Sequence, residues 1–215
     1  CRMDLGALYD KKRGLFLIGL DPDNPAAEQG ACYDLMASEA RILSLVAIAR
    51  GDVPAEHWRR LARPVALAGD GISLWSWSGT MFEYLLPTLF FTHKPGTLLG
   101  DMVEGAVTEQ IARGAATGRP WGVSEAGYYE FDLNMQYQYR AFGIPQLGMK
   151  SGLEQDQVVA PYATLMAYPF APLESWRNMR RLMELEALGD YGFFEAVDFT
   201  TARIEPGASY KLVSS

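Results

Sequence analysis

Residues Tyr33–Arg50, with the sequence YDLMASEARILSLVAIAR, predict a helix around which the rest of the fold prediction is built. Apolar side chains recur in this stretch among residues that favour helices, and Gly51 follows where a helix C-terminus often places glycine. The apolar positions are Leu35, Ile42, Leu43, Leu45, Val46 and Ile48. We therefore expect a helix that begins near Tyr33, with Glu39 about one turn inside it.

Five further helices are predicted by the same reasoning, and the second of them is interrupted at Pro87. They span Pro54–Leu61, Gly79–Phe91, Thr97–Gly118, Val159–Tyr168 and Pro172–Leu188. An apolar strand follows the turn at Lys11–Gly14, Gly71–Ser76 is extended, and a short two-stranded element joins Gly192–Phe199 with Arg203–Val213. Loops are expected at Asp21–Gly30, Pro64–Asp70 and Pro120–Asp132, and irregular chain at Tyr137–Lys150. Helices joined by long, aromatic, glycine-bearing loops favour an all-α toroid whose loops build a cleft at one end.

Composition and charge exclude several classes of function. The chain has 215 residues, 49% of them hydrophobic, which is enough for one domain with a sizeable core. Its formal net charge is −7, and its 19 basic residues are scattered apart from the pairs Arg59–Arg60 and Arg180–Arg181. A nucleic-acid partner is not expected, because phosphate binding requires a clustered basic face. The two cysteines and two histidines lack zinc-ligand spacing, so neither a metal nor a cofactor is expected.

Membrane insertion by this segment is also not expected. No apolar run approaches the roughly 18 to 20 residues that span a bilayer, and the first residues lack the basic-then-apolar pattern of a secretion signal. The chain starts without methionine and its C-terminus carries no helix stop. We expect residues 1–215 to be one domain cut from a larger polypeptide.

Two carboxylates are the candidate catalytic groups. YDLMASEAR (Tyr33–Arg41) and PWGVSEAGYYEFD (Pro120–Asp132) each place a glutamate, Glu39 and Glu125, beside serine and aromatic residues. Cleavage of a glycosidic bond requires two carboxyl groups, one to donate a proton and one to act as nucleophile or base. The aromatic surroundings of Glu125 should raise its pKa and suit it to the general acid/base role, with Glu39 as nucleophile. The reverse assignment stays open.

Other candidates would bind the sugar or hold the carboxylates in place. Aromatic rings serve as platforms for sugar faces, and Trp77 and Trp121 are the first choices for this role. Glu83 is either a helix N-terminal carboxylate or an acceptor for sugar hydroxyls, and Arg140 either orients a carboxylate or forms a structural ion pair. Asp34 either positions the surroundings of Glu39 or caps the helix. The full set of expected substrate-binding residues is Asp34, Trp77, Glu83, Trp121, Tyr128, Tyr139, Arg140 and Glu195.

Seven motifs in order resemble the glucoamylase-like domain of bacterial cyclic β-1,2-glucan synthases. They are YDLMASEAR, LWSWSGTMFEYLLP, PGTLL, PWGVSEA, YQYRAFG, VVAPYAT and YGFFEAVDFT, and the similarity runs from about Tyr9 to Thr201. The resemblance implies a relationship to β-1,2-glucanases, an (α/α)6-barrel fold with short β-hairpins in its loops, and a retaining transglycosylase that closes linear β-1,2-glucan into a ring. The chain ends before a serine-tyrosine-methionine-alanine-histidine-histidine-glutamine-glycine stretch that follows in relatives, so the barrel is expected to be incomplete.

Two alternatives remain on the sequence evidence, an inverting endo-β-1,2-glucanase and a glycan-binding or structural segment without turnover. Carboxyl groups about 5 to 5.5 Å apart indicate retention, whereas about 6.5 to 9.5 Å leaves room for the water of an inverting enzyme. The resemblance further implies that the partners are β-1,2-glucan and the remaining domains of the synthase. It implies a soluble domain on the cytoplasmic side of the bacterial inner membrane, whereas a free-standing relative would be periplasmic.

Overall fold

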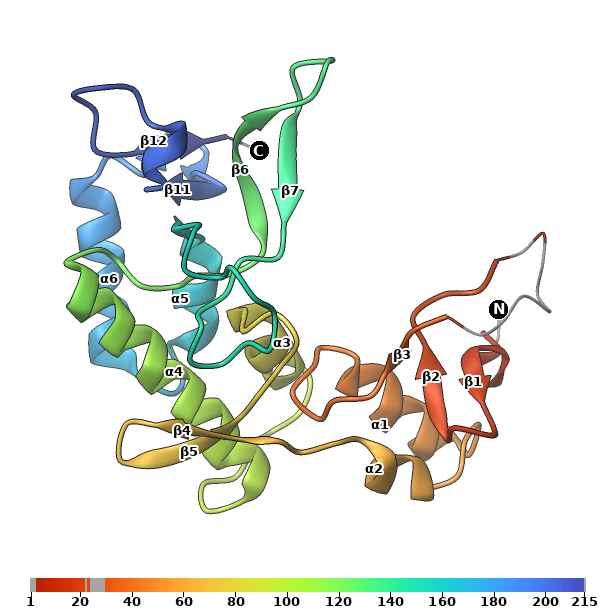
Figure 1. Cartoon of the computed structure of the whole chain (residues 1–215). Helices are drawn as coiled ribbons and strands as arrows, with labels where there is room; N and C mark the ends of the chain where they lie inside the picture. The colour runs from red at the N-terminus through yellow and green to blue at the C-terminus, as the bar shows by residue number, and fades with distance from the viewer. Residues whose placement is uncertain (1–2, 22, 24–29, 215) are drawn as a thin grey trace.

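The chain forms two parts that meet at an open angle (Figure 1). The computed structural model describes residues 3–21, 23 and 30–214. The smaller, N-terminal part holds α1 and α2, the larger part holds α3 to α6, and the β4–β5 hairpin lies at the base of the larger part. The α-helices span Arg41–Arg50 (α1), Glu56–Arg60 (α2), Met81–Leu85 (α3), Leu98–Thr117 (α4), Pro161–Ala167 (α5) and Pro172–Glu184 (α6). No helix in the described ranges is long and apolar enough to cross a membrane.

The N-terminal part packs a small antiparallel sheet against α1 and α2. The sheet has the order β1-β2-β3, from Tyr9–Asp10 (β1), Leu15–Leu17 (β2) and Cys32–Tyr33 (β3), and it follows the 3₁₀-helix Leu5–Leu8 (η1). His57 is fully buried between these elements, with one ring nitrogen 2.8 Å from the Ser44 hydroxyl and the other 2.9 Å from the Gly14 carbonyl. These two bonds join α1, α2 and the β1–β2 turn. The expected loop at Asp21–Gly30 lies almost wholly outside the described residues.

Helix α1 begins at Arg41, eight residues later than predicted. Tyr33 lies in β3, and the backbones of Leu35 and Ala37 form parallel bridges with Ala62 and Ser76. The buried Arg41 guanidinium donates to the carbonyls of Met36 and Tyr84, 2.8 and 3.1 Å away. Tertiary hydrogen bonds thus hold Tyr33 to Ala40 extended or turned, against its helical composition. The predicted end of the helix is confirmed, since Gly51 adopts the left-handed conformation at φ 74°.

The centre of the larger part is built on α4. The predicted limits of this helix are confirmed, because the Thr97 hydroxyl caps its N-terminus and Gly118 ends it at φ 65°. The hairpin of β4 (Val65–Ala68) and β5 (Gly71–Leu74) packs on α4, and α3 continues into the 3₁₀-helix Leu86–Leu89 (η2) around Pro87. The predicted loop at Pro64–Asp70 is therefore largely a strand. The buried core here includes Leu74, Met81, Tyr84, Leu85, Met102, Val103, Ala106 and Leu147.

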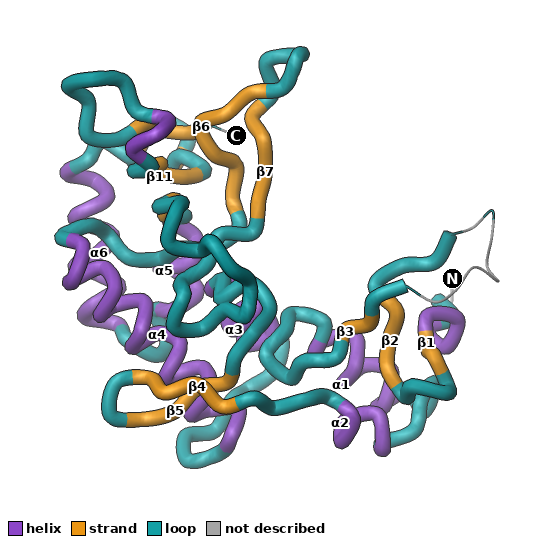
Figure 2. Tube along the Cα trace, viewed as in Figure 1, coloured by secondary structure: helices purple, strands orange, loops and turns teal. Residues whose placement is uncertain are grey.

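The C-terminal strands form a second layer beside α5 and α6. A sheet with the order β12-β11-β8 pairs Val158–Val159 (β8), Ala196–Asp198 (β11) and Lys211–Val213 (β12). This confirms the predicted pairing of the two C-terminal segments, with β8 as an additional strand. A small hairpin joins Leu188–Gly189 (β9) to Gly192–Phe193 (β10), and Thr201–Arg203 (η3) is a 3₁₀ turn. The hairpin of Ala126–Phe131 (β6) and Tyr137–Arg140 (β7) projects along one side of the open angle (Figure 2).

The expected all-α toroid, an (α/α)6 barrel, is wrong for this chain. The structure is mixed, with helices interspersed among several small antiparallel sheets (Figure 2). The strands are two to six residues long, which is too short for an alternating pattern to stand out from the helical signal around them. The β6–β7 hairpin, for which the sequence predicted loop and irregular chain, is an example. Its aromatic side chains, read as loop residues, are typical of strands.

Candidate active site

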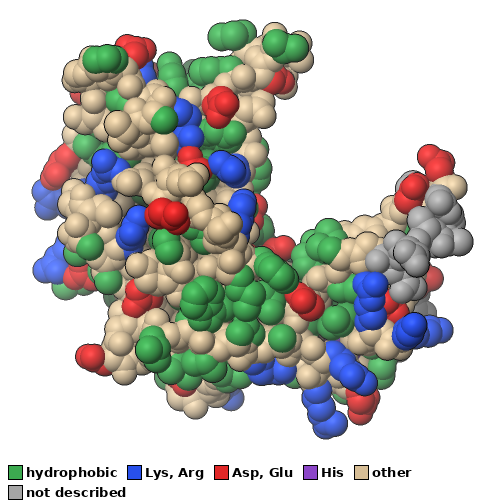
Figure 3. Space-filling model, in the orientation of Figure 1, with side chains coloured by type: hydrophobic (Ala, Val, Ile, Leu, Met, Phe, Trp, Pro, Cys, Tyr) green, Lys and Arg blue, Asp and Glu red, His purple; other side chains and the backbone are tan. Residues whose placement is uncertain are grey.

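The inner side of the open angle is hollowed, and both hydrophobic and acidic side chains gather on its floor (Figure 3). Six of the ten predicted site residues lie in the connection from β3 to α1, the loop from Trp75 to Thr80, and the segment from Trp121 into β6. These segments are far apart in sequence. Hydrogen bonds between them, described below, bring the candidate residues together.

Glu39 lies in the turn directly before α1, rather than inside a helix as predicted. It is half-buried, and the Ser38 hydroxyl donates to its Oε2 at 3.2 Å. Ser38 is itself held by the Ala40 amide, which donates to the Ser38 Oγ at 3.1 Å. A hollow of about 750 Å³ opens beside Glu39, lined by Tyr33 and by apolar side chains of α1. The carboxylate therefore has both a fixed orientation and open space in front of it.

Asp34 and Trp77, two of the predicted substrate-binding residues, contact each other. The Trp77 indole Nε1 donates to Asp34 Oδ1 at 2.9 Å, and the Trp77 side chain remains half-exposed. Asp34 does not cap a helix, because no helix begins there and its backbone carbonyl accepts from the Ala62 amide. The bond ties the half-exposed Trp77 side chain to the segment that leads to Glu39. A sugar platform requires an aromatic ring that is held in place and exposed in this way.

Glu83 is buried beneath the loop that carries Trp77. Its carboxylate accepts from the Ser76 hydroxyl at 2.7 Å and from the amides of Ser78 and Thr80 at 3.2 and 3.1 Å. With the Thr80 side chain it forms a capping box at the start of α3. Of the two interpretations of Glu83, these contacts support the helix N-terminal carboxylate, which here also shapes the loop.

Burial raises the pKa of Glu83 from 4.5 to about 7; the Ser76, Ser78 and Thr80 hydrogen bonds oppose the rise and the charge of Glu39 adds to it. Between pH 4.5 and about pH 7, Glu83 is therefore mostly protonated in the folded protein but mostly ionised in the unfolded chain. The free energy of unfolding should fall as pH rises from about 4.5 to about 7, by roughly 3 kcal/mol from this group. In Glu83→Gln this decline should be missing.

The measurement is urea unfolding of the wild-type protein and Glu83→Gln from about pH 5 to about pH 8. The difference between the two free energies should change steadily across this range. Glu154→Gln, at an exposed loop position, is the control and should keep the wild-type dependence on pH. Parallel curves for wild type and Glu83→Gln would refute the assignment.

Glu125 lies just before β6 and is fixed through its backbone as well as its side chain. Its amide donates to the Thr80 hydroxyl at 3.0 Å, and its carbonyl accepts from the Tyr162 hydroxyl at 2.9 Å. The Tyr139 hydroxyl donates to its side-chain Oε2 at 3.2 Å. Behind it, the Ser124 hydroxyl lies 2.9 Å from that of Thr80 and 2.8 Å from that of Tyr162. Glu125 is thus tied to α3, α5 and β7 at once.

The charge of Glu39 influences the pKa values of several groups of the candidate site. The pKa of Glu125 is raised by burial, with the Tyr139 hydrogen bond opposing the rise and the charge of Glu39 adding to it. The pKa of Tyr33 is raised by burial and then by the charges of both Glu39 and Glu125. Glu83, as noted, also responds to Glu39. Within the described residues, no cluster of three or more His, Cys, Asp and Glu side chains could hold a metal ion.

Trp121 and Tyr128 are placed differently from what was predicted. Trp121 is buried at 4% exposure, and its amide donates to the side chain of Asn178 on α6, so its ring belongs to the core and cannot serve as a sugar platform. The Tyr128 ring packs edge-on against Phe142, with centroids 5.3 Å apart, and lies under the Arg203 guanidinium. Both aromatics support the segment around Glu125 from behind.

Tyr139, Arg140 and Glu195 lie around the β6–β7 hairpin. Tyr139 contacts Glu125 directly, as described, and is 64% exposed. Arg140 forms an ion pair with Asp156 at 2.9 Å, which agrees with the structural interpretation of this residue. Glu195 is half-buried and accepts from the Gly127 amide at 3.3 Å, and its charge contributes to the raised pKa of Tyr139.

Sequence reasoning did not single out Thr80, Ser124 and Tyr162, the three hydroxyl residues that hold Glu125. Each lies inside a motif quoted above, but their contact with Glu125 depends on three segments meeting in space. Tyr33 was quoted only as the first residue of its motif. No spacing in the sequence indicates these contacts.

Comparisons with known proteins agree with the motifs. Residues 112–211 match the family described as putative glucoamylase. The cyclic β-(1,2)-glucan synthase NdvB of Rhizobium meliloti (strain 1021) is 45% identical over 211 residues, which cover 98% of this chain and 7% of the synthase. A solved endo-β-1,2-glucanase from Chitinophaga pinensis, in complex with sophorotriose and glucose, shares the fold with a TM-score of 0.65 at 16% identity, covering 87% of this chain and 48% of that one.

The chain therefore spans only a small part of the length of the curated relative that it matches. The structural likeness, at low sequence identity, is a likeness of fold alone. The resemblance inferred from the motifs is confirmed: residues 112–211 are similar to the putative glucoamylase family, and nearly the whole chain is similar to a segment of a cyclic β-(1,2)-glucan synthase.

Proposed function

We propose that this chain processes β-1,2-glucan by cleaving a glycosidic bond with Glu39 and Glu125 and transferring the glycosyl group to a sugar hydroxyl. The observation that carries the proposal is how Glu125 is held: Thr80 and Tyr162 bond its backbone, and the Tyr139 hydroxyl donates to its carboxylate. Burial raises the pKa of this carboxyl group, and the charge of Glu39 adds to the rise. The 45% identity with a cyclic β-(1,2)-glucan synthase supports the substrate class. The segment would act as part of the catalytic domain of a larger polypeptide, with the remaining domains as its partners.

In the proposed reaction, the acid transfers its proton to the glycosidic oxygen while the other carboxylate attacks the anomeric carbon. The bond to the leaving sugar breaks and a glycosyl ester forms. A hydroxyl group of the glucan then attacks the ester carbon, its proton passes to the now ionised acid, and the carboxylate is released. When the attacking hydroxyl belongs to the same chain, the product is a ring.

Three features of the structure fit this reaction. Burial raises the pKa of Glu125, which favours the protonated form that an acid needs at neutral pH. Ser38 orients Glu39 from its own segment. The half-exposed Trp77 ring is held by Asp34, which lies five residues before Glu39, and it offers a face for a sugar residue. The Tyr139 hydrogen bond favours the ionised form of Glu125, so azide rescue of alanine variants is needed to assign the roles of the two carboxylates.

Product analysis with linear β-1,2-glucan tests the proposal, using the native-length protein. Cyclic or transfer products that disappear in Glu125→Gln and Glu39→Gln would support it. Linear oligosaccharides with inverted anomeric configuration would replace it with an inverting glucanase. Glucan binding without any turnover would leave a glycan-binding segment. If the glucan is cyclised where it is made, this segment faces the cytoplasm at the bacterial inner membrane, and we propose that location. Protease added to intact spheroplasts should then leave the segment uncut.

A further inference from the structure

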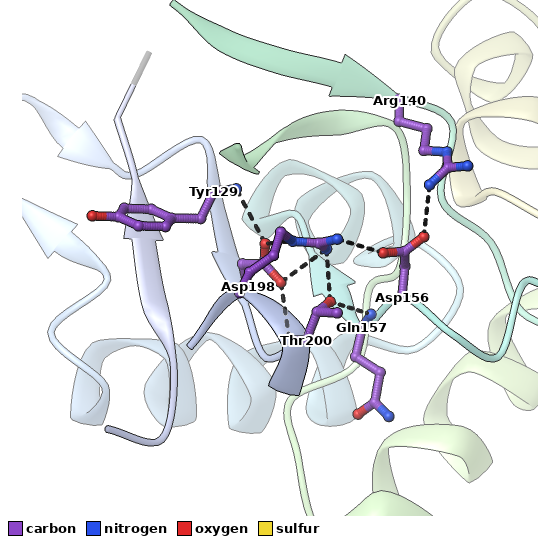
Figure 4. Close-up of polar contacts among 7 residues, drawn as sticks. Tyr129, Arg140, Asp156, Gln157, Asp198 and Thr200 are labelled. Carbon is purple, nitrogen blue, oxygen red and sulfur yellow. Dashed lines mark hydrogen bonds and ion pairs between the residues drawn. The ribbon is translucent and has the colours of Figure 1, made fainter. Parts of the chain in front are cut away.

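Four charged side chains and one threonine hydroxyl form a cluster at the base of the β6–β7 hairpin (Figure 4). We call Arg140, Asp156, Asp198, Thr200 and Arg203 the Arg203 cluster. Asp156 bridges the two arginines, 2.6 Å from Arg203 and 2.9 Å from Arg140. Arg203 also bonds Asp198 at 2.7 Å and the Thr200 hydroxyl at 2.7 Å. Asp198 is fully buried and Arg203 is 15% exposed, so water competes little with the bond between them. Arg140, at 47% exposure, reaches this buried group from the edge through Asp156, which is 15% exposed.

The Arg203 cluster holds both strands of the hairpin. Two residues of β6 contact the cluster. The Tyr129 amide donates to the buried Asp198 at 3.1 Å, and the centre of the Tyr128 ring lies 4.8 Å from the Arg203 guanidinium. On β7, the contact is the ion pair of Arg140 with Asp156 (Figure 4). The hairpin otherwise projects into solvent at its tip, where Leu133 and Met135 are exposed. Its base is therefore where its position is set.

The pleat of β7 connects this cluster to Glu125. Tyr139 and Arg140 are neighbours in the strand, so their side chains point to opposite faces. Arg140 is directed to Asp156, and Tyr139 is directed to Glu125. The residue paired with Tyr139 on β6 is Gly127, which has no side chain to pack beside the ring. Because Tyr139 is also 64% exposed, little packing holds it, and its direction depends on the strand itself.

We propose that Arg140 is a positioning residue, whose ion pair with Asp156 fixes the β7 pleat so that the Tyr139 hydroxyl reaches Glu125. This inference rests on the proposed catalytic role of Glu125. It predicts that Arg140 acts only through Tyr139. It also assigns Tyr139 to orienting the carboxylate, a different role from the sugar platform expected from the sequence.

A hydrogen bond donated to a carboxylate favours its ionised form and lowers its pKa. Loss of the Tyr139 hydroxyl should therefore raise the pKa of Glu125. A change that turns the Tyr139 side chain away from Glu125 should raise this pKa as well. The titratable groups electrostatically coupled to Glu125 are Glu39 ahead of α1, Tyr33 of β3, Tyr139 of β7 and Tyr162 of α5. Of these, only Tyr139 is altered by the variants below.

The test is a double-mutant cycle on glucan turnover with Tyr139→Phe, Arg140→Met and the double variant. We expect each single change to lower kcat about 10-fold with KM within about 2-fold, and the double variant to be no worse than Tyr139→Phe. The pH profile of kcat/KM should move toward higher pH in both single variants. Arg140→Lys, which keeps the charge, should recover most of the activity.

The control is Arg177→Met, which breaks a similar ion pair with Glu174 on α6 and should leave the pH profile unchanged. Additive effects in the cycle, or a pH profile that Arg140→Met does not move, would overturn the inference. Thermal unfolding of each variant separates a loss of stability from a loss of positioning, and Arg140→Lys carries the test if Arg140→Met folds poorly. Full activity in Glu125→Gln would instead refute the proposed function itself.

Discussion

Replacement of Glu125 by Gln should lower the rate of β-1,2-glucan cleavage by at least about 10³-fold, which is typical of the loss of a catalytic carboxyl group. The amide is nearly the same size and can still accept the Tyr139 hydrogen bond, so the local structure should persist. It can neither release a proton to the glycosidic oxygen nor carry the negative charge that the reaction needs. Binding of the glucan should remain within about 3-fold, because the sugar platform is untouched.

The measurement pairs turnover of linear β-1,2-glucan with calorimetric binding. Glu130→Gln is a matched control, since Glu130 lies on the same strand, β6, but is exposed to solvent. It should keep wild-type turnover. If Glu125→Gln retained turnover within about 2-fold of wild type, the catalytic assignment would be wrong whatever its effect on stability.

The elements predicted well from the sequence are those with local signals at both ends. Helix α4 follows Thr97 as cap and ends at Gly118, and α1 ends at Gly51, all as predicted. The start of α1 was misplaced because the bonds that hold Tyr33 to Ala40 extended come from Ala62, Ser76 and the buried Arg41. Ala62 and Ser76 are distant in sequence, and the Arg41 side chain also bonds Tyr84, so helix propensity alone does not reveal that these contacts prevail.

The strands show the same limit. In the β4–β5 hairpin, Gly69 and Asp70 are the kind of residues that turn two strands, but the strands have four residues each and were taken for loop and extended chain. The predicted helices alone suggested a toroid. The short strands of the sheets gave no alternating hydrophobic pattern that could be detected in the sequence. The pairing of Ala196–Asp198 with Lys211–Val213 falls within the two-stranded element predicted for Gly192–Phe199 and Arg203–Val213.

For the candidate site, residue types and motifs identified candidate residues, but the sequence did not reveal which of their side chains would be buried. Glu39 and Glu125 were singled out by their neighbours in sequence, and burial, with a smaller addition from the charge of Glu39, raises the pKa of Glu125. Trp121 lies in one of the same motifs, but its ring packs in the core. Nothing in PWGVSEAGYYEFD distinguishes a ring that faces a cleft from one that packs in the core, because that depends on core residues distant in sequence, such as Met102 and Ala106.

Replacement of Glu39 by Ala should also lower turnover by at least about 10³-fold, and azide should restore part of it. The small side chain leaves a space beside Ser38 in the hollow next to α1, which azide can enter. If Glu39 is the nucleophile, azide attacks the anomeric carbon as the protonated Glu125 donates to the leaving sugar. The product of a β-linked substrate is then an α-glycosyl azide, formed by one displacement.

The anomer of the azide product assigns the two roles. With Glu39 as nucleophile, Glu125→Ala should give a β-glycosyl azide from a substrate with a good leaving group, because the glycosyl ester on Glu39 forms first and azide opens it in a second displacement. Exchanged anomers in the two variants would reverse the roles while keeping the pair. Glu56→Ala, which removes an exposed carboxylate on α2, is the control and should need no rescue. Failure of azide in both variants, together with inverted products from the wild-type protein, would contradict a glycosyl ester intermediate.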